Sequence, residues 1–215
     1  MHDARCGTPD ERRQRVRNFA THDLVRVDPA VARAWPDAPA WIEASLARAP
    51  WVVVRRQSDP HGIAVGVRGA SRAQRYAAWL EPTAAIACAS PEEIGLPDEA
   101  RSPLDRACAS VARDAAWLGL TWGPIGAYGF ERASATLATH PASDLDVLVR
   151  ATGVSRATLA AFASRCAATT EQHGVRIDVE LAFGDRGIAL GELMRARDRV
   201  LAKTSSGPML VPCPV

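Results

Sequence analysis

Two aspartates stand two residues apart at the head of a strongly apolar segment, Ser-Asp-Leu-Asp-Val-Leu-Val at positions 143–149. The β-branched and apolar residues predict a buried strand over residues 145–150. Because side chains alternate along a strand, Asp144 and Asp146 share one face, and the apolar residues between and after them share the other. The segment therefore predicts a sheet with one buried face and with two carboxylates on the opposite face, where the strand begins.

An acidic pair held on a strand is suited to a hard divalent cation. Its carboxylates lie about 6–7 Å apart, and magnesium prefers carboxylate oxygens while leaving positions for the phosphate oxygens of a nucleotide. An isolated Asp-x-Asp also occurs as a turn former or a surface ion-pair partner. The alternating segment Arg-Ile-Asp-Val-Glu-Leu at 176–181 offers a third carboxylate, Asp178 or Glu180, from one face of a second strand.

The second half of the chain alternates strand and helix, which predicts an α/β or α+β layer. Ser102, Pro103 and Asp105 have the spacing of a helix N-cap with a capping box. After that helix, the expected elements are a strand near 122–128 followed by Gly129, a helix near 130–138, the strand at 145–150, a helix from Ser155 to about Gly174, and a strand at 175–183.

The first half has the pattern of a small α+β domain. Its expected elements are a strand at 22–27, a helix at 38–49 and a hairpin of 51–56 with 62–68. We expect residues 1–18 to be a disordered tail, 19–100 an N-terminal α+β domain and 101–215 a catalytic domain. The proline-rich segment 89–102 is the expected connection.

Charge and composition restrict the class of protein. Lys and Arg number 26 against 24 Asp and Glu, a balance that argues against binding to nucleic acid through phosphate neutralisation. The sequence has neither the apolar core of a secretory signal nor an apolar run of membrane-spanning length. The five cysteines are widely spaced and form no Cys-x-x-Cys pair. We expect a cytoplasmic protein without a membrane segment.

The order of these parts resembles the nucleotidyltransferase superfamily in Gly129, Asp144, Asp146 and Asp178. Over most of its length, the chain more narrowly resembles the malonate decarboxylase holo-acyl-carrier-protein synthases, also called phosphoribosyl-dephospho-CoA transferases. The matching pieces are His-Asp-Leu-Val at 22–25, Val-Val-Val-Arg-Arg at 52–56, Tyr-Gly at 128–129, Ser-Asp-Leu-Asp-Val-Leu at 143–148, His-Gly-Val-Arg-Ile-Asp-Val-Glu-Leu at 173–181 and Val-Leu-Ala-Lys-Thr at 200–204.

The resemblance implies a nucleotidyltransferase that moves a phosphoribosyl-dephospho-CoA group from its triphosphoribosyl-dephospho-CoA precursor to a serine of the acyl-carrier subunit of malonate decarboxylase, with release of pyrophosphate. By the same resemblance, Mg²⁺ binds Asp144 and Asp146. Asp178 is the third ligand or the base for the serine, with Glu180 as its competitor. The fold it implies is α+β, with a mixed sheet flanked by helices in the catalytic domain.

The candidate substrate-binding residues are Gly129, Ser143 and Lys203, with Arg55 and Arg56 lower-ranked. The ammonium of Lys203 is a common kind of triphosphate contact, and a solvated lysine is the alternative. Alternation sends Arg55 and Arg56 to opposite faces, so at most one of them reaches a shared phosphate site and the other is expected in a surface ion pair. Lys203 is the one lysine of the chain. Where the superfamily has Gly-Ser, this chain reads Gly-Phe at 129–130, so a hydroxyl is missing. Two alternatives therefore stay open: a nucleotidyltransferase for another hydroxyl acceptor, and a catalytically silent relative that binds the carrier.

Overall fold

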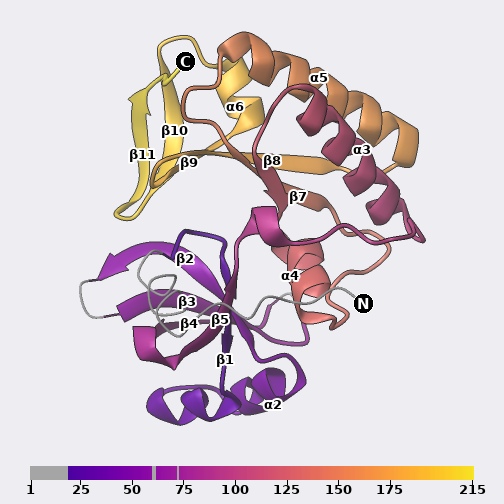
Figure 1. The fold of residues 1–215 in the computed structure, drawn as a ribbon. Coiled ribbons are helices and arrows are strands. Elements are labelled where there is room, and N and C mark those ends of the chain that lie inside the picture. The colour runs from indigo at the N-terminus through magenta and orange to yellow at the C-terminus, as the bar shows by residue number, and fades with distance from the viewer. Residues whose placement is uncertain (1–18, 60–61, 72) are drawn as a thin grey trace, which may run out of the picture. The chain divides into compact units, whose positions relative to one another are not determined.

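The computed structural model describes residues 19–59, 62–71 and 73–215. The chain divides into two compact units, Met1–Cys88 and Ala89–Val215. Each unit combines helices with one β-sheet, which confirms the predicted α+β class (Figure 1). The tail expected over 1–18 and the expected hairpin turn at 60–61 lie outside the described residues. The segment 89–102, expected as a connection, belongs to the second unit.

The first unit contains a five-stranded sheet in the order β4-β3-β2-β1-β5. Its elements are β1 (Leu24–Val27), η1 (Pro29–Ala34), α2 (Trp41–Arg48), β2 (Trp51–Asp59), β3 (Gly62–Arg68), β4 (Arg75–Leu80), η2 (Pro82–Ala84) and β5 (Ala85–Ala89). The predicted hairpin is confirmed, since β2 and β3 pair antiparallel. Helix α2 buries Ile42 and Leu46 in the core of this unit, as its helical apolar spacing predicts.

The second unit contains a six-stranded sheet in the order β11-β10-β9-β8-β7-β6. Its elements are η3 (Pro91–Glu93), α3 (Pro103–Trp117), β6 (Trp122–Pro124), α4 (Gly126–Ser134), β7 (Leu145–Arg150), α5 (Arg156–His173), β8 (Ile177–Phe183), β9 (Arg186–Ala189), α6 (Leu190–Arg195), β10 (Arg199–Thr204) and β11 (Gly207–Pro212). Strands β7 and β8 are parallel and their neighbours are antiparallel, so the sheet is mixed as expected.

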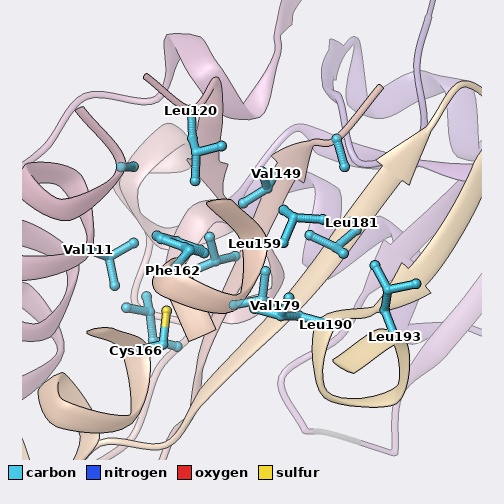
Figure 2. Close-up of a cluster of buried hydrophobic side chains, with 14 of the residues drawn as sticks. Val111, Leu120, Val149, Leu159, Phe162, Cys166, Val179, Leu181, Leu190 and Leu193 are labelled. Atoms are coloured by element: carbon cyan, nitrogen blue, oxygen red, sulfur yellow. The ribbon is translucent and has the colours of Figure 1, made fainter. Parts of the chain in front are cut away.

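The parallel pair follows from the long crossover helix α5. Ser155 caps its N-terminus by accepting from the Thr158 N–H, and Gly174 ends it in the left-handed conformation, with φ 66°. Helices α3 and α5 lie side by side over one face of the sheet (Figure 1). Figure 2 shows the core beneath them, where Phe162 from α5 packs among buried side chains of the strands.

The core fixes which face of β7 is acidic. Leu145, Val147 and Val149 are fully buried in this core. Because side chains alternate along the strand, Asp146 points to the face opposite the core. Apolar burial of the neighbours therefore holds this carboxylate in a defined direction, as the sequence pattern predicted.

The segment between β6 and β7 differs from the prediction. The expected strand 122–128 ends at Pro124, and the expected helix 130–138 begins earlier, at Gly126. The apolar run reads as a strand, but Gly126 adopts φ 66°, a left-handed conformation that stops an extended chain and is accessible to glycine. Gly129 therefore lies inside α4 and does not directly follow a strand.

Candidate active site

Strand pairing brings three carboxylates to one edge of the second sheet. Asp146 on β7 lies beside Asp178 on β8 in the parallel register. One residue earlier, the Leu145 N–H donates to the carbonyl of Arg176 at 2.9 Å, which places Asp144 beside Arg176. Because Asp144 and Asp146 are two residues apart, both project from the face opposite the core.

Arg176 connects two of these carboxylates. Its Nη2 lies 2.5 Å from Asp144 Oδ2 and 2.9 Å from Asp178 Oδ2. The hydrogen bond to Asp144 and the charges of Asp178 and Asp144 raise the pKa of Arg176 above its usual value. Sequence reasoning assigned Arg176 no role, although its position two residues before Asp178 places both side chains on the same face of the chain.

The three acids have the right chemistry for a hard cation, because carboxylate oxygens are the ligands that magnesium prefers. Within the described part of the chain, no three His, Cys, Asp or Glu side chains are already arranged to hold a metal ion. At this edge the guanidinium of Arg176 lies against Asp144 and Asp178. The chemistry of the donors therefore suits the expected cation, and in this structure Arg176 occupies the position between Asp144 and Asp178.

Gly126 is the glycine that meets the acidic face. A Cβ atom added to it would lie 2.0 Å from Asp146 Oδ2, so the carboxylate rests directly on its Cα. Gly126 begins α4, whose first-turn N–H groups have no partner within the helix and carry the positive end of the helix dipole. The backbone is tied to the same strand, since the Ile125 N–H donates to the Asp146 carbonyl at 2.9 Å.

Gly129 and Phe130, the pair expected at this position, lie further along α4. A Cβ added to Gly129 would meet the Pro124 carbonyl oxygen at 2.5 Å, and Phe130 is buried. The residue after Gly126 is Ala127, so the hydroxyl of the superfamily Gly-Ser pair is still missing. The signal was ambiguous because glycines recur every three residues, at 123, 126 and 129.

Ser143 shapes the turn that leads into the acidic strand. Its Oγ accepts from the His140 N–H at 2.9 Å, and its own N–H donates to the His140 carbonyl at 2.9 Å. These two hydrogen bonds fix the backbone directly before Asp144. The hydroxyl oxygen is therefore engaged in the turn, and we assign Ser143 a structural contribution to the position of Asp144.

Glu180 and Lys203 form an ion pair beside the three aspartates. Lys203 Nζ on β10 lies 2.8 Å from Glu180 Oε2 on β8. The Glu180 side chain is 9% exposed and that of Lys203 is 66% exposed. In the register Glu180 lies beside Leu148, whereas Asp178 lies beside Asp146. Between the two acids considered for the third carboxylate, the geometry favours Asp178.

Arg55 and Arg56 lie on β2 of the first unit. Arg55 is exposed and Arg56 is half-buried. A Cβ added to Gly66 on the neighbouring strand would lie 3.5 Å from Arg55 Cδ, so the aliphatic part of Arg55 packs over that glycine. Both arginines remain lower-ranked candidates for phosphate contacts.

A cavity of about 850 Å³ lies in the second unit, between the start of α3, helix α4 and the segment that leads to the acidic strand. Its wall includes Tyr128, whose hydroxyl donates to Asp105 Oδ1 at 2.7 Å. Pro141 and Val175 also line it, and they stand close in the chain to Asp144 and Arg176. This volume is in the range of small-molecule sites.

Comparison with known proteins identifies the class and then the family. Residues 20–91 match the family model for the phosphoribosyl-dephospho-CoA transferase MdcG N-terminal domain, and residues 85–214 match that for the C-terminal domain. The chain is a transferase. It belongs to the phosphoribosyl-dephospho-CoA transferase family, which confirms the resemblance found in the sequence.

Curated relatives align over nearly the whole chain. A phosphoribosyl-dephospho-CoA transferase of Pseudomonas aeruginosa is 40% identical over 198 residues, 90% of this chain and 92% of the relative. The enzyme of the same name from Klebsiella pneumoniae is 34% identical over 202 residues, 90% of this chain and 94% of the relative. No solved structure matches the chain. Among the described residues, the helices are too short or too polar to cross a membrane.

Proposed function

We propose that this transferase moves the phosphoribosyl-dephospho-CoA group from triphosphoribosyl-dephospho-CoA to a serine of the acyl-carrier subunit of malonate decarboxylase, in the cytoplasm. The observation that carries the proposal is the meeting of Asp144, Asp146 and Asp178 at one edge of a sheet in a chain of this family. Phosphoryl transfer requires positioning and charge neutralisation, and an acidic metal-binding edge supplies both.

The reaction is an in-line displacement at phosphorus. The serine oxygen attacks the phosphorus attached to the ribose, a new P–O bond forms, and the bond to the outer two phosphates breaks. Pyrophosphate leaves with the electron pair of that bond, and the serine proton passes to a base. The two products are pyrophosphate and a carrier that bears the prosthetic group through a phosphodiester.

Asp144 and Asp146 would hold Mg²⁺, and Asp178 would act as the third ligand or accept the serine proton. Magnesium, when bound, supplies neutralisation of the negative charge on the phosphates. Asp178 is 50% exposed, so an acceptor hydroxyl can approach it from solvent. The rigid β7 keeps Asp146 in place because its neighbours on both sides are fully buried.

The N-terminus of α4 and the nearby cavity would receive the donor substrate. The first-turn N–H groups of this nine-residue helix, which have no partner within the helix, suit phosphate oxygens. The cavity of about 850 Å³ would accommodate an uncharged part of the dephospho-CoA moiety, because its wall has four acids, at 98, 99, 105 and 131, against two arginines, at 101 and 132.

A catalytically silent carrier-binding relative is the second candidate. Ala127 favours it, since this residue cannot supply the hydroxyl of the superfamily Gly-Ser pair. Intact mass of the carrier separates the two functions. The purified chain is incubated with Mg²⁺, the triphosphate donor and the apo carrier subunit.

A mass increase equal to the prosthetic group is expected with the wild type and is expected to be absent with Asp146→Asn, which removes a metal-binding charge but keeps the shape. Asp114→Asn is the control, because it removes a carboxylate that pairs with Arg165 at 2.9 Å on the helical side. An unmodified carrier that co-elutes with the wild type would support the silent relative. Equal modification by Asp146→Asn would refute the assigned site.

A further inference from the structure

Four charged side chains form a square where β7 and β8 begin. Asp146 and Asp178 lie side by side, and Asp144 and Arg176 lie side by side one step earlier. Along each strand the two members are two residues apart and project from the same face. Arg176 thus has Asp144 and Asp178 as its two nearest corners, and these are the two carboxylates that it contacts.

The charge of this square favours a divalent cation. Three carboxylates and one guanidinium give −3 + 1 = −2 at neutral pH. The carboxylates repel one another, and a single nitrogen of Arg176 offsets part of that repulsion by bridging two of them. The Arg176 side chain is 64% exposed, so water replaces its contacts readily when it moves away.

We propose that Arg176 is the counter-ion of Asp144 and Asp178 when no metal is bound, and that a divalent cation displaces it from both carboxylates. A cation and the guanidinium compete for the same two oxygens, Oδ2 of each aspartate. Arg176 is therefore a positioning residue that sets the cation concentration at which the site loads. The inference rests on the proposed function, because that proposal assigns the cation to this edge.

Manganese binding tests the competition without any turnover. Free Mn²⁺ is measured by electron paramagnetic resonance during titration of the full chain, in the absence of donor substrate and carrier. Arg176→Gln removes the competing charge, so its Mn²⁺ dissociation constant should fall on the order of tenfold. Arg165→Gln removes an arginine from an ion pair with Asp114, away from the square, and should keep the wild-type constant.

A second measurement does not depend on the stability of the glutamine variant. The Nε–H signals of wild-type protein with ¹⁵N-labelled arginine are followed as Mg²⁺ is added. The signal of Arg176, identified by its loss in Arg176→Lys, should shift with saturation. An unchanged Mn²⁺ constant in Arg176→Gln, or an Arg176 signal that stays in place while the metal binds, would overturn the proposal.

Failure of this inference is distinguishable from failure of the proposed function. If the wild type modifies the carrier but Mn²⁺ binding does not depend on Arg176, the counter-ion role of Arg176 is refuted and the proposed transfer reaction is unaffected. If the wild type does not modify the carrier but Arg176→Gln binds Mn²⁺ more tightly than the wild type, the counter-ion role of Arg176 is supported and the assigned reaction is refuted.

Discussion

Replacing Gly126 with alanine adds one methyl group at the point where α4 meets the acidic strand. The new Cβ would lie 2.0 Å from Asp146 Oδ2 and 2.7 Å from Asp146 Cγ. Carbon and oxygen atoms in contact need more than 3 Å, so the carboxylate must move by about 1 Å or more. Misplacement of this size in a catalytic group costs about 100-fold in rate, which is the expected loss of carrier modification.

The same substitution also strains the backbone, and this effect must be separated from the displacement. Gly126 has φ 66°, where an L-residue costs about 1–2 kcal/mol. Gly119 has φ 67°, and a Cβ added to it would meet nothing within 4 Å. Gly119→Ala is thus a matched control that carries the strain without the clash.

Urea unfolding and intact-mass assays of the two variants decide the outcome. Both variants should lose about 1–2 kcal/mol of unfolding free energy. Gly126→Ala alone should lose transfer activity, and Gly119→Ala should modify the carrier at nearly the wild-type rate. Equal activity of the two variants would refute the placement of Gly126 against a catalytic carboxylate.

Two further substitutions test contacts around the site. Asp105→Ala should reduce the unfolding free energy by about 1–2 kcal/mol at pH 7, because Asp105 accepts from the Ser102 N–H at 2.8 Å and from the Tyr128 hydroxyl at 2.7 Å. Burial alone would raise the pKa of Asp105, but these hydrogen bonds lower the pKa further than burial raises it. The contribution of Asp105 to the unfolding free energy is therefore present above about pH 4 and is lost as the pH falls through the lowered pKa. Urea unfolding should therefore show a smaller difference between Asp105→Ala and wild type at low pH than at pH 7, and an equal difference at both would contradict the assignment. Lys203→Met should lower the unfolding free energy by about 1–3 kcal/mol, because it removes the ion pair of the buried Glu180 carboxylate. Adding Glu180→Met should recover part of this loss. A double variant that loses as much unfolding free energy as the two single variants together would show that the two side chains are not coupled.

Local patterns in the sequence were enough to predict α3, β7, α5 and β8 of the second unit. The helix α3 begins where the capping residues indicated, with the Asp105 N–H donating to Ser102 Oγ at 3.0 Å. Helix α5 lies between Ser155 and Gly174 as predicted. These signals are local because caps act within one turn and apolar spacing follows the period of the element.

The composition of the acidic edge was also accessible from the sequence. Period-two alternation predicted which face of β7 carries Asp144 and Asp146, and burial of the intervening residues agrees. The family was predicted from short motifs, and family models that match residues 20–91 and 85–214 confirm it. The roles of Asp144 and Asp146 in metal binding and catalysis remain predictions.

Only the tertiary structure decided which distant residues meet. Parallel pairing of β7 and β8 in one register places Asp178 beside Asp146 and Arg176 against Asp144, across the whole of α5. Selection of Gly126 from three evenly spaced glycines likewise depended on the contact with Asp146. Alternation assigns a side chain to a face, but strand order and register, set by packing of the entire sheet, determine its neighbour.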